Sequence, residues 1–457
     1  MCRLLIFSLL FLSVNIAVGQ SGYKIDVQLK HFKNATLYHG NYYGKNTFLV
    51  DSARIDGDGE ASFKGDKDLP SGIYFVLLPK KQKYFEILLD KDDRFSIVAD
   101  SANQFNNLVF SHSPVNEMFR EYNSYIRDQQ KEVAKAAQAG ADSSAIAAKK
   151  EEVGNNIQAY RNKIIKEHPA TFLATLFKAM KDPIVPKKPK HNSDTAFGYH
   201  YFKKHYWDGI DFSDSSIIRT PILETRLHRY FTRLVPPVPD SVNREADAIL
   251  AKAKQNKEMF KFVLWWLTST YEKSPYMGMD AVFVHLVEKY YVHGDAYWIE
   301  QKQLDKIIDK AAKIAPNLIG NTAPELDLKT PDLQEVKLSD VKAEYVILVF
   351  WDPTCGHCKV IVPRLDSAYK HSWKQMGVEM VGVLAGGTKE QWLDFIKKHK
   401  LSDWVNLWDP KQKNLYRQLY DVYQTPVIYL LDKNKKIKAK KLDVKQLEEV
   451  LNHLEKG

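Results

Sequence analysis

The sequence predicts a multidomain α+β protein made of three regions in order along the chain. We expect an antiparallel β-sandwich over residues 21–112, a helical region over residues 113–315 and an α/β domain over residues 316–457. Three observations support this division: short alternating segments between turn residues, then long polar segments with helix-capping signals, then buried apolar strands alternating with helices. The composition, 44% hydrophobic and 27% charged, is that of a globular protein and excludes a disordered or fibrous chain.

Short β-type segments make up the first region. The predicted strands are 23–29, 36–43, 47–55, 61–64, 72–78, 84–89 and 95–99. Asp56-Gly57-Asp58-Gly59 is a strong turn signal, and we expect a hairpin between the strands on either side of it. A calcium loop is the alternative, but an EF-hand needs flanking helices and a glutamate at its twelfth position, whereas Glu60 comes four residues after Asp56. Turns at intervals of about 8–12 residues therefore favour a small antiparallel sandwich.

The second region carries helix start and stop signals. Ser113-Pro114 places a capping residue before a proline at the first helical position, and residues 140–143 separate this helix from the next. The predicted helices are 114–139, 143–167, 170–180, 260–271, 279–292 and 298–315. His200 and His205 are five residues apart, which places them on different faces of a helix, and aromatic clusters nearby favour packing over a cofactor site. This region by itself indicates no function.

The N-terminus has the pattern of a secretory signal. Arg3 provides a positive charge, the apolar run 4–14 follows, and Ala17-Val18-Gly19 supplies small residues at the cleavage position. We expect residues 1–19 to be a cleaved signal peptide that directs the chain to the periplasm or cell envelope. An uncleaved anchor is the alternative, although the apolar run is short for a spanning helix. Cys2 precedes the apolar run, so lipidation is not expected.

The net charge points to no charged partner. Lys and Arg number 66 against 56 Asp and Glu, which gives a formal charge of +10. The lysines are scattered among acidic residues, as in 433–441, without the aromatic and glycine pattern of a nucleic-acid site. We interpret them as solvated faces and edge-strand protection, and we expect no nucleic-acid partner.

The cysteines indicate chemistry rather than scaffolding. Cys2 lies in the predicted signal, which leaves Cys355 and Cys358, and a loop this short gains little from a structural disulfide. The apolar run 345–351 is typical of a strand buried on both faces, and the two cysteines follow it at the start of a predicted helix that ends near Met376. Further predicted strands are 378–384, 426–431 and 436–442, with helices at 388–399 and 444–454.

A Cys-x-x-Cys pair at a strand-to-helix junction has a mechanism. Cys355 would lie at the helix N-terminus, where unpaired N–H groups and the helix dipole favour the thiolate that attacks disulfides. Cys358, one helical turn further on, can then resolve the mixed disulfide. His357 adds an imidazole that can stabilise the thiolate when it is protonated. We expect Cys355 to be exposed and Cys358 to be a buried thiol.

Two alternatives fit these residues less well. Zinc binding would use Cys355, Cys358 and His371, but no histidine or cysteine lies at 374–376, where the fourth ligand is needed. A peroxidase would need a threonine three residues before its reactive cysteine, and that position holds Asp352. We therefore expect no metal and no cofactor.

Residues 317–457 resemble the thioredoxin superfamily, most closely the envelope thiol-disulfide oxidoreductases of the TlpA/ResA type. The residues that carry the resemblance are Gly320-Asn321-Thr322-Ala323-Pro324, Phe350-Trp351, Cys355-Gly356-His357-Cys358, Pro363 and Thr425-Pro426. They lie in about 30% of the chain, 141 of 457 residues. The resemblance implies a cis peptide bond at Pro426 beside the redox pair, and a backbone at Thr425 that hydrogen-bonds a bound partner chain.

This sequence departs from the family in two places. Thr354 stands where the family usually has tryptophan before the first cysteine. Val349 and Gly387 occupy the positions of the buried acid, so proton transfer to Cys358 must use water or another group.

The sequence thus predicts a periplasmic thiol-disulfide oxidoreductase acting on protein disulfide clients. Its catalytic residues would be Cys355, Cys358, His357 and Pro426, and its partner-binding residues Trp351, Pro353, Gly356 and Thr425. The resemblance implies a reductant supplied by a membrane thiol-electron donor, whereas the Gly356-His357 pair argues for a more oxidising reduction potential than that of thioredoxin. The front and middle regions resemble uncharacterised domains attached to such thioredoxins. In the alternative, these regions form an envelope binding or scaffold protein whose dithiol only senses redox state.

Overall fold

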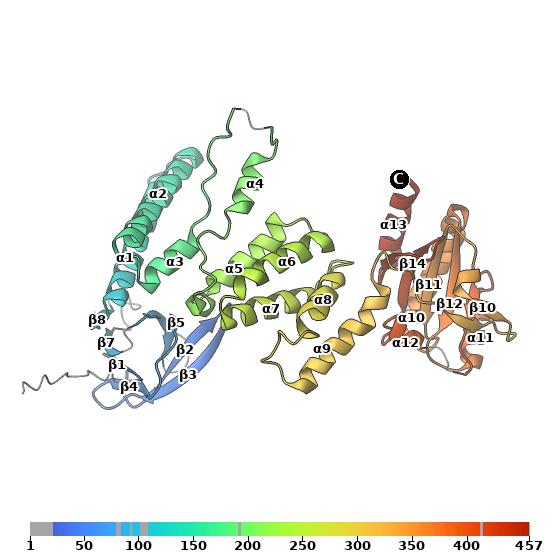
Figure 1. The fold of residues 1–457 in the computed structure, drawn as a ribbon, viewed down its shortest axis with the longest axis horizontal. Helices are drawn as coiled ribbons and strands as arrows, with labels where there is room; N and C mark the ends of the chain where they lie inside the picture. Colours follow the sequence, from blue (N-terminus) through green and yellow to red (C-terminus); the bar gives the residue numbers. More distant parts are fainter. Residues whose placement is uncertain are drawn as a thin grey trace, which may run out of the picture. The chain divides into compact units, whose positions relative to one another are not determined.

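The computed structural model describes residues 22–78, 84–91, 94–100, 108–190, 193–411 and 415–456. These residues form two compact units, which meet in the sequence between His228 and Arg229 (Figure 1). The predicted signal peptide, 1–19, lies outside the described residues. Among the described helices, none has the length and apolar character needed to cross a membrane.

The first unit begins with two packed sheets, one mixed and one antiparallel. One has the order β4-β1-β7-β8, in which only the β1–β7 pair is parallel, and the other has the order β3-β2-β5-β6. The strands are β1 Tyr23–Leu29, β2 Thr36–Tyr43, β3 Asn46–Arg54, β4 Glu60–Gly65, β5 Gly72–Leu77, β6 Tyr84–Leu89, β7 Arg94–Ala99 and β8 Val109–Ser111. Alternate apolar side chains from both sheets form one core, as strand periodicity requires.

The predicted hairpin at residues 56–59 is wrong in its pairing. The turn itself is present, since the Asp56 side chain accepts hydrogen bonds from the backbone N–H groups of Asp58 and Glu60. However, β3 pairs with β2 and β4 pairs with β1, so the turn leads from one sheet to the other. A turn signal identifies the bend but does not choose the strand's partner.

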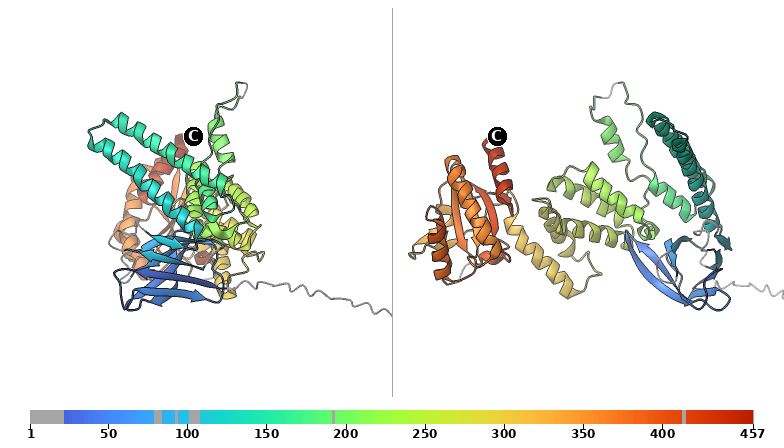
Figure 2. Two further views of the ribbon diagram at one scale, coloured as in Figure 1. Left: turned by 90° about the vertical axis from the view of Figure 1, so that its left-hand side faces the viewer. Right: turned by 180° about the vertical axis from the view of Figure 1, so that it is seen from behind.

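Helices follow the sandwich in the first unit. They are α1 Pro114–Gln138, α2 Ser143–Glu167, α3 Phe172–Met180, α4 Phe197–Lys204, the 3-10 helix Ser215–Arg219 and α5 Pro221–Arg229, whose last residue falls in the second unit. The long α1 and α2 lie side by side (Figure 2). Buried Asn116 of α1 joins the helices to the sandwich: its amide bonds both backbone groups of Leu88 in β6 and the Ser113 hydroxyl.

The second unit begins with helices and ends with an α/β domain. The helical elements are the π-helix Tyr230–Leu234, α6 Pro239–Ala253, α7 Lys257–Glu272, α8 Asp280–Leu286, the π-helix Val287–Tyr291, α9 Gln301–Ile314 and the 3-10 helix Ala315–Asn317. Asn256 caps α7 by accepting from the N–H groups of Glu258 and Met259, which explains where that helix starts.

A mixed five-stranded sheet, of order β13-β12-β11-β14-β15, organises the α/β domain. β11 (Tyr345–Trp351) is central; β12 runs parallel to it and β14 antiparallel. The other elements are β9 Asp327–Lys329, β10 Glu335–Lys337, the 3-10 helix Leu338–Asp340, α10 Gly356–His371, the 3-10 helix Trp373–Met376, β12 Val378–Leu384, α11 Lys389–His399, β13 Val405–Leu407, α12 Tyr416–Leu419, β14 Val427–Asp432, β15 Ile437–Lys440 and α13 Val444–Lys456.

Both faces of this sheet are covered. Alternate residues of β11 enter two separate cores: Ile347, Val349 and Trp351 face α10, α11 and α13, whereas Val346, Leu348 and Phe350 face the β9 and α12 side. A central strand covered on both sides must be apolar throughout, which explains the continuous run in the sequence. The predicted fold class, an N-terminal β-sandwich, a helical middle region and a C-terminal thioredoxin-like α/β domain, is confirmed, except that the sandwich is not antiparallel throughout, because β1 and β7 pair in parallel.

Candidate active site

The cysteine pair lies at the carboxyl end of the central strand. Asp352 follows β11 directly, and Cys355 occupies the N-cap position of α10 with extended backbone angles, φ −69° and ψ 128°. The Cys355 N–H donates to the Asp352 carbonyl, and the Cys355 carbonyl accepts from Lys359 N–H. A rigid buried strand and the first turn of a helix therefore fix the backbone on either side of Cys355.

The two thiols have different surroundings. Cys355 is partly exposed and Cys358 is fully buried, and both are free cysteines. Cys355 Sγ lies 3.3 Å from the Thr425 carbonyl oxygen, and the Asp352 N–H points at Cys358 Sγ from 3.5 Å. The first sulfur is thus accessible to another molecule, whereas the second is enclosed behind it.

These surroundings move the two pKa values apart. The backbone N–H groups at the start of α10, that of Cys358 above all, lower the pKa of the Cys355 thiol. Burial raises the pKa of Cys358 to about 11. One thiol is therefore prepared for attack, and the other stays protonated until the exchange step.

The Thr425–Pro426 peptide bond is cis, as the resemblance implied. Thr425 and Pro426 are half-buried and precede β14, and the Thr425 carbonyl contacts the Cys355 sulfur. Gly356 and His357 are exposed on the first turn of α10. These residues surround Cys355 on its open side.

Trp351 and Pro353 lie elsewhere than expected. Trp351 is 0% exposed and its ring packs 5.0 Å from that of Phe395, and Pro353 is also buried. Trp351 is the last residue of β11, and the strand's alternation turns its side chain into the core. Both side chains are therefore enclosed within the domain rather than presented to a partner.

Asp352 and Gly386, which sequence reasoning did not assign to the site, also fix the loop before Cys355. Asp352 Oδ1 accepts from the Thr354 N–H at 2.7 Å and from the Thr354 hydroxyl at 2.6 Å. A Cβ on Gly386 would lie 2.3 Å from Asp352 Oδ2, so the glycine leaves room for the carboxylate. The spacing of Asp352 and Thr354 is an Asx-turn signal, which could have identified Asp352 from the sequence. Thr354 therefore has a local structural role.

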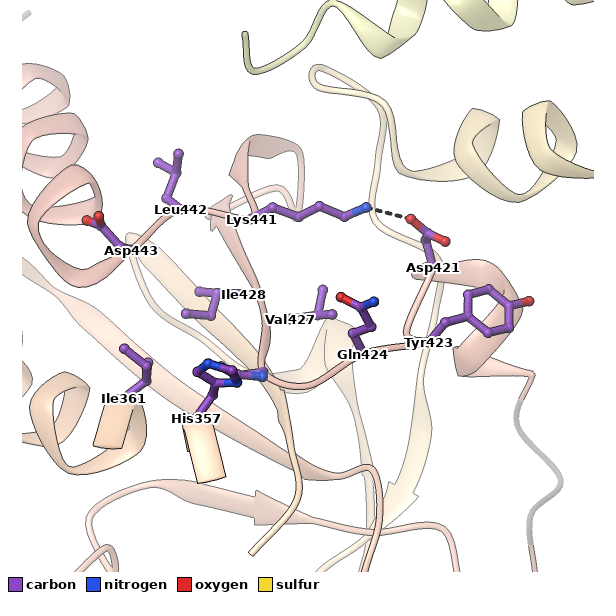
Figure 3. A pocket seen from close by; sticks show the side chains of 11 residues that line it. His357, Ile361, Asp421, Tyr423, Gln424, Val427, Ile428, Lys441, Leu442 and Asp443 are labelled. Atoms are coloured by element: carbon purple, nitrogen blue, oxygen red, sulfur yellow. Dashed lines mark hydrogen bonds and ion pairs between the residues drawn. The ribbon is translucent and has the colours of Figure 1, made fainter. Parts of the chain in front are cut away.

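A groove opens beside the cysteine pair, between α10, the segment before β14 and the segment after β15 (Figure 3). Its volume is about 570 Å³, and Lys441 crosses it to form a 2.5 Å ion pair with Asp421. Its lining residues are His357, Ile361, Asp421, Tyr423, Gln424, Pro426, Val427, Ile428, Lys441, Leu442 and Asp443. The sequence indicated His357 and Pro426 but gave no signal for Lys441, Leu442 and Asp443.

The lysine-rich segment that forms one side of this groove is not a uniformly solvated face. Lys435 and Lys440 are buried, with 8% and 5% of their surface exposed, although we expected solvated lysines throughout residues 433–441. The segment is a sheet edge covered by residues 320–323, and Lys440 finds polar partners inside. Sequence pattern did not distinguish these two positions.

The geometry separates the proposed zinc ligands. Cys358 lies in the first turn of α10 and His371 is its last residue, which places them about 20 Å apart along the helix axis. Within the described ranges, no group of three or more His, Cys, Asp and Glu side chains is arranged to hold a metal ion. His371 and the cysteine pair therefore cannot share one ion.

Three segments of the chain match known families. Residues 319–440 match the AhpC/TSA family, residues 143–317 match a domain of unknown function, DUF5106, and residues 23–119 match another, DUF4369. The two compact units do not follow these limits, and the three-domain division stays a prediction.

The chain is similar to named thiol-disulfide oxidoreductases. ResA of Geobacillus thermodenitrificans is 28% identical over 137 residues, which is 30% of this chain and 76% of the relative. ResA of Bacillus cereus is 28% identical over 138 residues, 30% of this chain and 78% of the relative. With the AhpC/TSA match, these relatives show a thioredoxin-like C-terminal domain whose homologues are thiol-disulfide oxidoreductases.

Solved structures resemble the chain over parts of its length. A thioredoxin-like protein from Bacteroides caccae has 21% identity and a TM-score of 0.46, and the match covers 60% of this chain and 99% of that one. A domain of a possible thiol-disulfide isomerase from Cytophaga hutchinsonii has 39% identity and a TM-score of 0.28, over 31% of this chain and 96% of that one.

Proposed function

We propose that the protein is a thiol-disulfide oxidoreductase that reduces disulfides of protein clients. The observation that carries the proposal is the asymmetry of the cysteine pair: Cys355 is accessible with a lowered pKa, and Cys358 is buried with a pKa raised to about 11. This is the asymmetry that a nucleophile and a resolving thiol need. The printed names of the ResA relatives support the same reaction class.

The exchange proceeds in two balanced steps. The Cys355 thiolate attacks one sulfur of the client disulfide, a Cys355–client bond forms, and the other client sulfur leaves as a thiolate and takes up a proton. Cys358 then loses its proton and attacks Cys355 Sγ, which releases the second client thiol. The client gains two electrons, and Cys355 and Cys358 are left joined as a disulfide.

The open side of Cys355 provides the contacts for a client. Pro426 and the Thr425 backbone lie beside the reactive sulfur, and Gly356 leaves the approach along α10 free of a side chain. The groove continues from His357 over the apolar side chains of Ile361 and Leu442, which suits a client segment with an apolar residue next to its cysteine. His357 is exposed next to Cys355, its backbone N–H helps to lower the pKa of the Cys355 thiol, and its side chain lines the groove.

The proposed setting is the periplasm. The pattern in residues 1–19 supports export through a cleaved signal. A reductant in an oxidising compartment must be re-reduced after each turnover, so the Cys355–Cys358 disulfide needs a dithiol donor, which we place in the membrane. Cell fractionation with mass spectrometry tests this setting: a periplasmic protein with its N-terminus at Gln20 supports it, an intact Met1 in the membrane fraction indicates the uncleaved anchor instead, and recovery in the cytoplasm contradicts it.

Insulin reduction tests the activity. The full mature chain with dithiothreitol should precipitate the insulin B chain far faster than dithiothreitol alone, and Cys355→Ser should abolish the acceleration. Cys358→Ser should instead trap a covalent Cys355–insulin complex, because the resolving thiol is missing. Equal rates for the wild type and Cys355→Ser would overturn the proposal and favour a binding or scaffold role.

A further inference from the structure

A buried polar cluster lies directly behind the groove. Lys440, the last residue of β15, is 5% exposed, and its ammonium donates to the Asn317 carbonyl at 2.8 Å and to Asn317 Oδ1 at 3.1 Å. Its third contact is a 2.5 Å ion pair with Asp280 at the start of α8. The reaction described above uses none of these three residues.

Every donor of this cluster has a partner. The three N–H bonds of the ammonium are matched by the two Asn317 oxygens and Asp280. The Asn317 amide donates to the carbonyls of Lys313 and Leu419, at 3.0 and 3.1 Å. The acceptors are not all satisfied, since Asp280 Oδ1 is buried without a hydrogen-bond partner among the described residues. An apolar cluster would serve stability at least as well as such a network, so we look for its role in the geometry that it imposes.

The cluster links the two segments that form the walls of the groove. One wall is residues 421–427, which begin two residues after Leu419, and the other is residues 441–443, which begin directly after Lys440. Asn317 holds the first wall through the Leu419 carbonyl and the second through Lys440. The walls are joined directly where the Lys441 N–H donates to the Ile428 carbonyl at 2.7 Å, and again by the Lys441–Asp421 ion pair. Asn317 adds a side-chain link between Leu419 and Lys440, the residues that precede the two walls.

The helices before the α/β domain are part of this brace. Asp280 belongs to α8, and Asn317 ends the 3-10 helix after α9. Lys313 of α9 also places its ammonium 5.2 Å from the centre of the Tyr423 ring, on the first wall. The helical segment thus contacts both walls within the second unit.

We propose that Lys440, Asn317 and Asp280 are positioning residues for client recognition, which hold the groove walls apart at the spacing that protein clients need. The inference rests on the proposed function, since it names a determinant of client selection at the same site. A small disulfide that reaches Cys355 without filling the groove should not depend on this spacing.

Lys440→Met in the full chain tests the inference with two substrates. We expect kcat/KM for insulin to fall about tenfold, mainly through KM, because small displacements of binding groups reduce productive encounters. The rate with dithiobis-nitrobenzoate and the Cys355–Cys358 reduction potential should stay at wild-type values. Lys438→Met, at an exposed position on the same strand, is the matched control and should change neither substrate.

A second variant removes one link only. Asn317→Asp keeps an oxygen for Lys440 but loses the N–H donors to Leu419 and Lys313, so it should show the same selective loss. Amide hydrogen exchange in residues 421–425 and 441–443 should rise in both variants. Lys440→Arg, which keeps the charge, should recover part of the insulin activity.

Two results would overturn the inference, and a third would overturn the proposed function on which it rests. Equal losses with both substrates, together with a lower unfolding temperature, would show that the cluster only supports stability. Wild-type kinetics and wild-type hydrogen exchange in both variants would show that it positions nothing. If the wild type and Cys355→Ser are equally inactive with both substrates, the proposed function fails instead; exchange at the walls that is unchanged in Lys440→Met would then contradict the brace as well.

Discussion

The difference between the two thiols can be measured by alkylation of single-cysteine variants. In Cys358→Ser only Cys355 remains, and in Cys355→Ser only Cys358 remains. With a pKa of about 11, Cys358 is ionised to about one part in 10,000 at pH 7. An ordinary thiol, with a pKa of about 8.5, is already ionised to more than about one part in 100 at pH 7, and the backbone N–H groups at the start of α10 lower the pKa of Cys355 further.

Ionisation alone overstates the expected ratio of rates. A thiolate is more nucleophilic when its thiol has a higher pKa, with a Brønsted coefficient of about 0.4–0.5. The greater nucleophilicity of the Cys358 thiolate therefore offsets about tenfold of the hundredfold difference in ionised fraction. The chemistry therefore predicts that Cys355 reacts at least about tenfold faster than Cys358. The complete burial of Cys358 adds a further factor, because iodoacetamide must reach the sulfur.

The assay is the rate of iodoacetamide incorporation at pH 7, followed by mass spectrometry on the folded variants. Repeating it in denaturant gives the matched control, since both unfolded thiols should react alike. Raising the pH towards 11 should accelerate the Cys358 reaction steadily, whereas the Cys355 rate should level off at a lower pH. Equal rates in the folded variants, or faster alkylation of Cys358, would refute the assignment of nucleophile and resolving thiol.

Three further predictions concern the sandwich and the loop before Cys355. Burial lowers the pKa of His39 from 6.5 to about 4, so the folded protein favours the neutral ring and its stability falls as the pH drops from 6.5 towards 4. In urea unfolding, we expect the free energy of unfolding to be about 2 kcal/mol lower at pH 5 than at pH 8. His39→Phe should remove that loss, and a variant whose stability has the same pH dependence as the wild type would contradict the role of His39. Asn116→Ala leaves both backbone groups of Leu88 unpaired and should lower the free energy of unfolding by about 2–4 kcal/mol. An unchanged free energy of unfolding would refute the contact. Asp352→Ala and Gly386→Ala both disturb the same carboxylate and should slow insulin reduction about three- to tenfold, while wild-type rates in both would show that the loop needs no such support.

Sequence reasoning succeeded where one local pattern determines the outcome. The strands 345–351 and 378–384 were predicted with their observed limits, because continuous apolar runs between polar turns leave few alternatives. The helix 143–167 was also predicted with its limits, since the Asp142 side chain caps it as the polar break before it suggested. The chemistry of the cysteine pair followed from its place between a strand and a helix.

Features that depend on long-range packing could not be predicted. The burial of Lys440 depends on Asn317 and Asp280, which are 123 and 160 positions away in the sequence. The sequence indicates Trp351 as a partner-binding residue, yet the alternation of β11 places its side chain in the core. The partner of β4 likewise depends on the whole sandwich and not on the turn that precedes it.

The reduction potential of the Cys355–Cys358 pair tests the central claim most directly. The full chain would be equilibrated in defined thiol–disulfide buffers and its free thiols trapped by alkylation. The account predicts a single two-electron transition at or below thioredoxin's value of about −270 mV, as a reductant of protein disulfides requires. A transition near about −180 to −120 mV, or failure to form the disulfide, would contradict it.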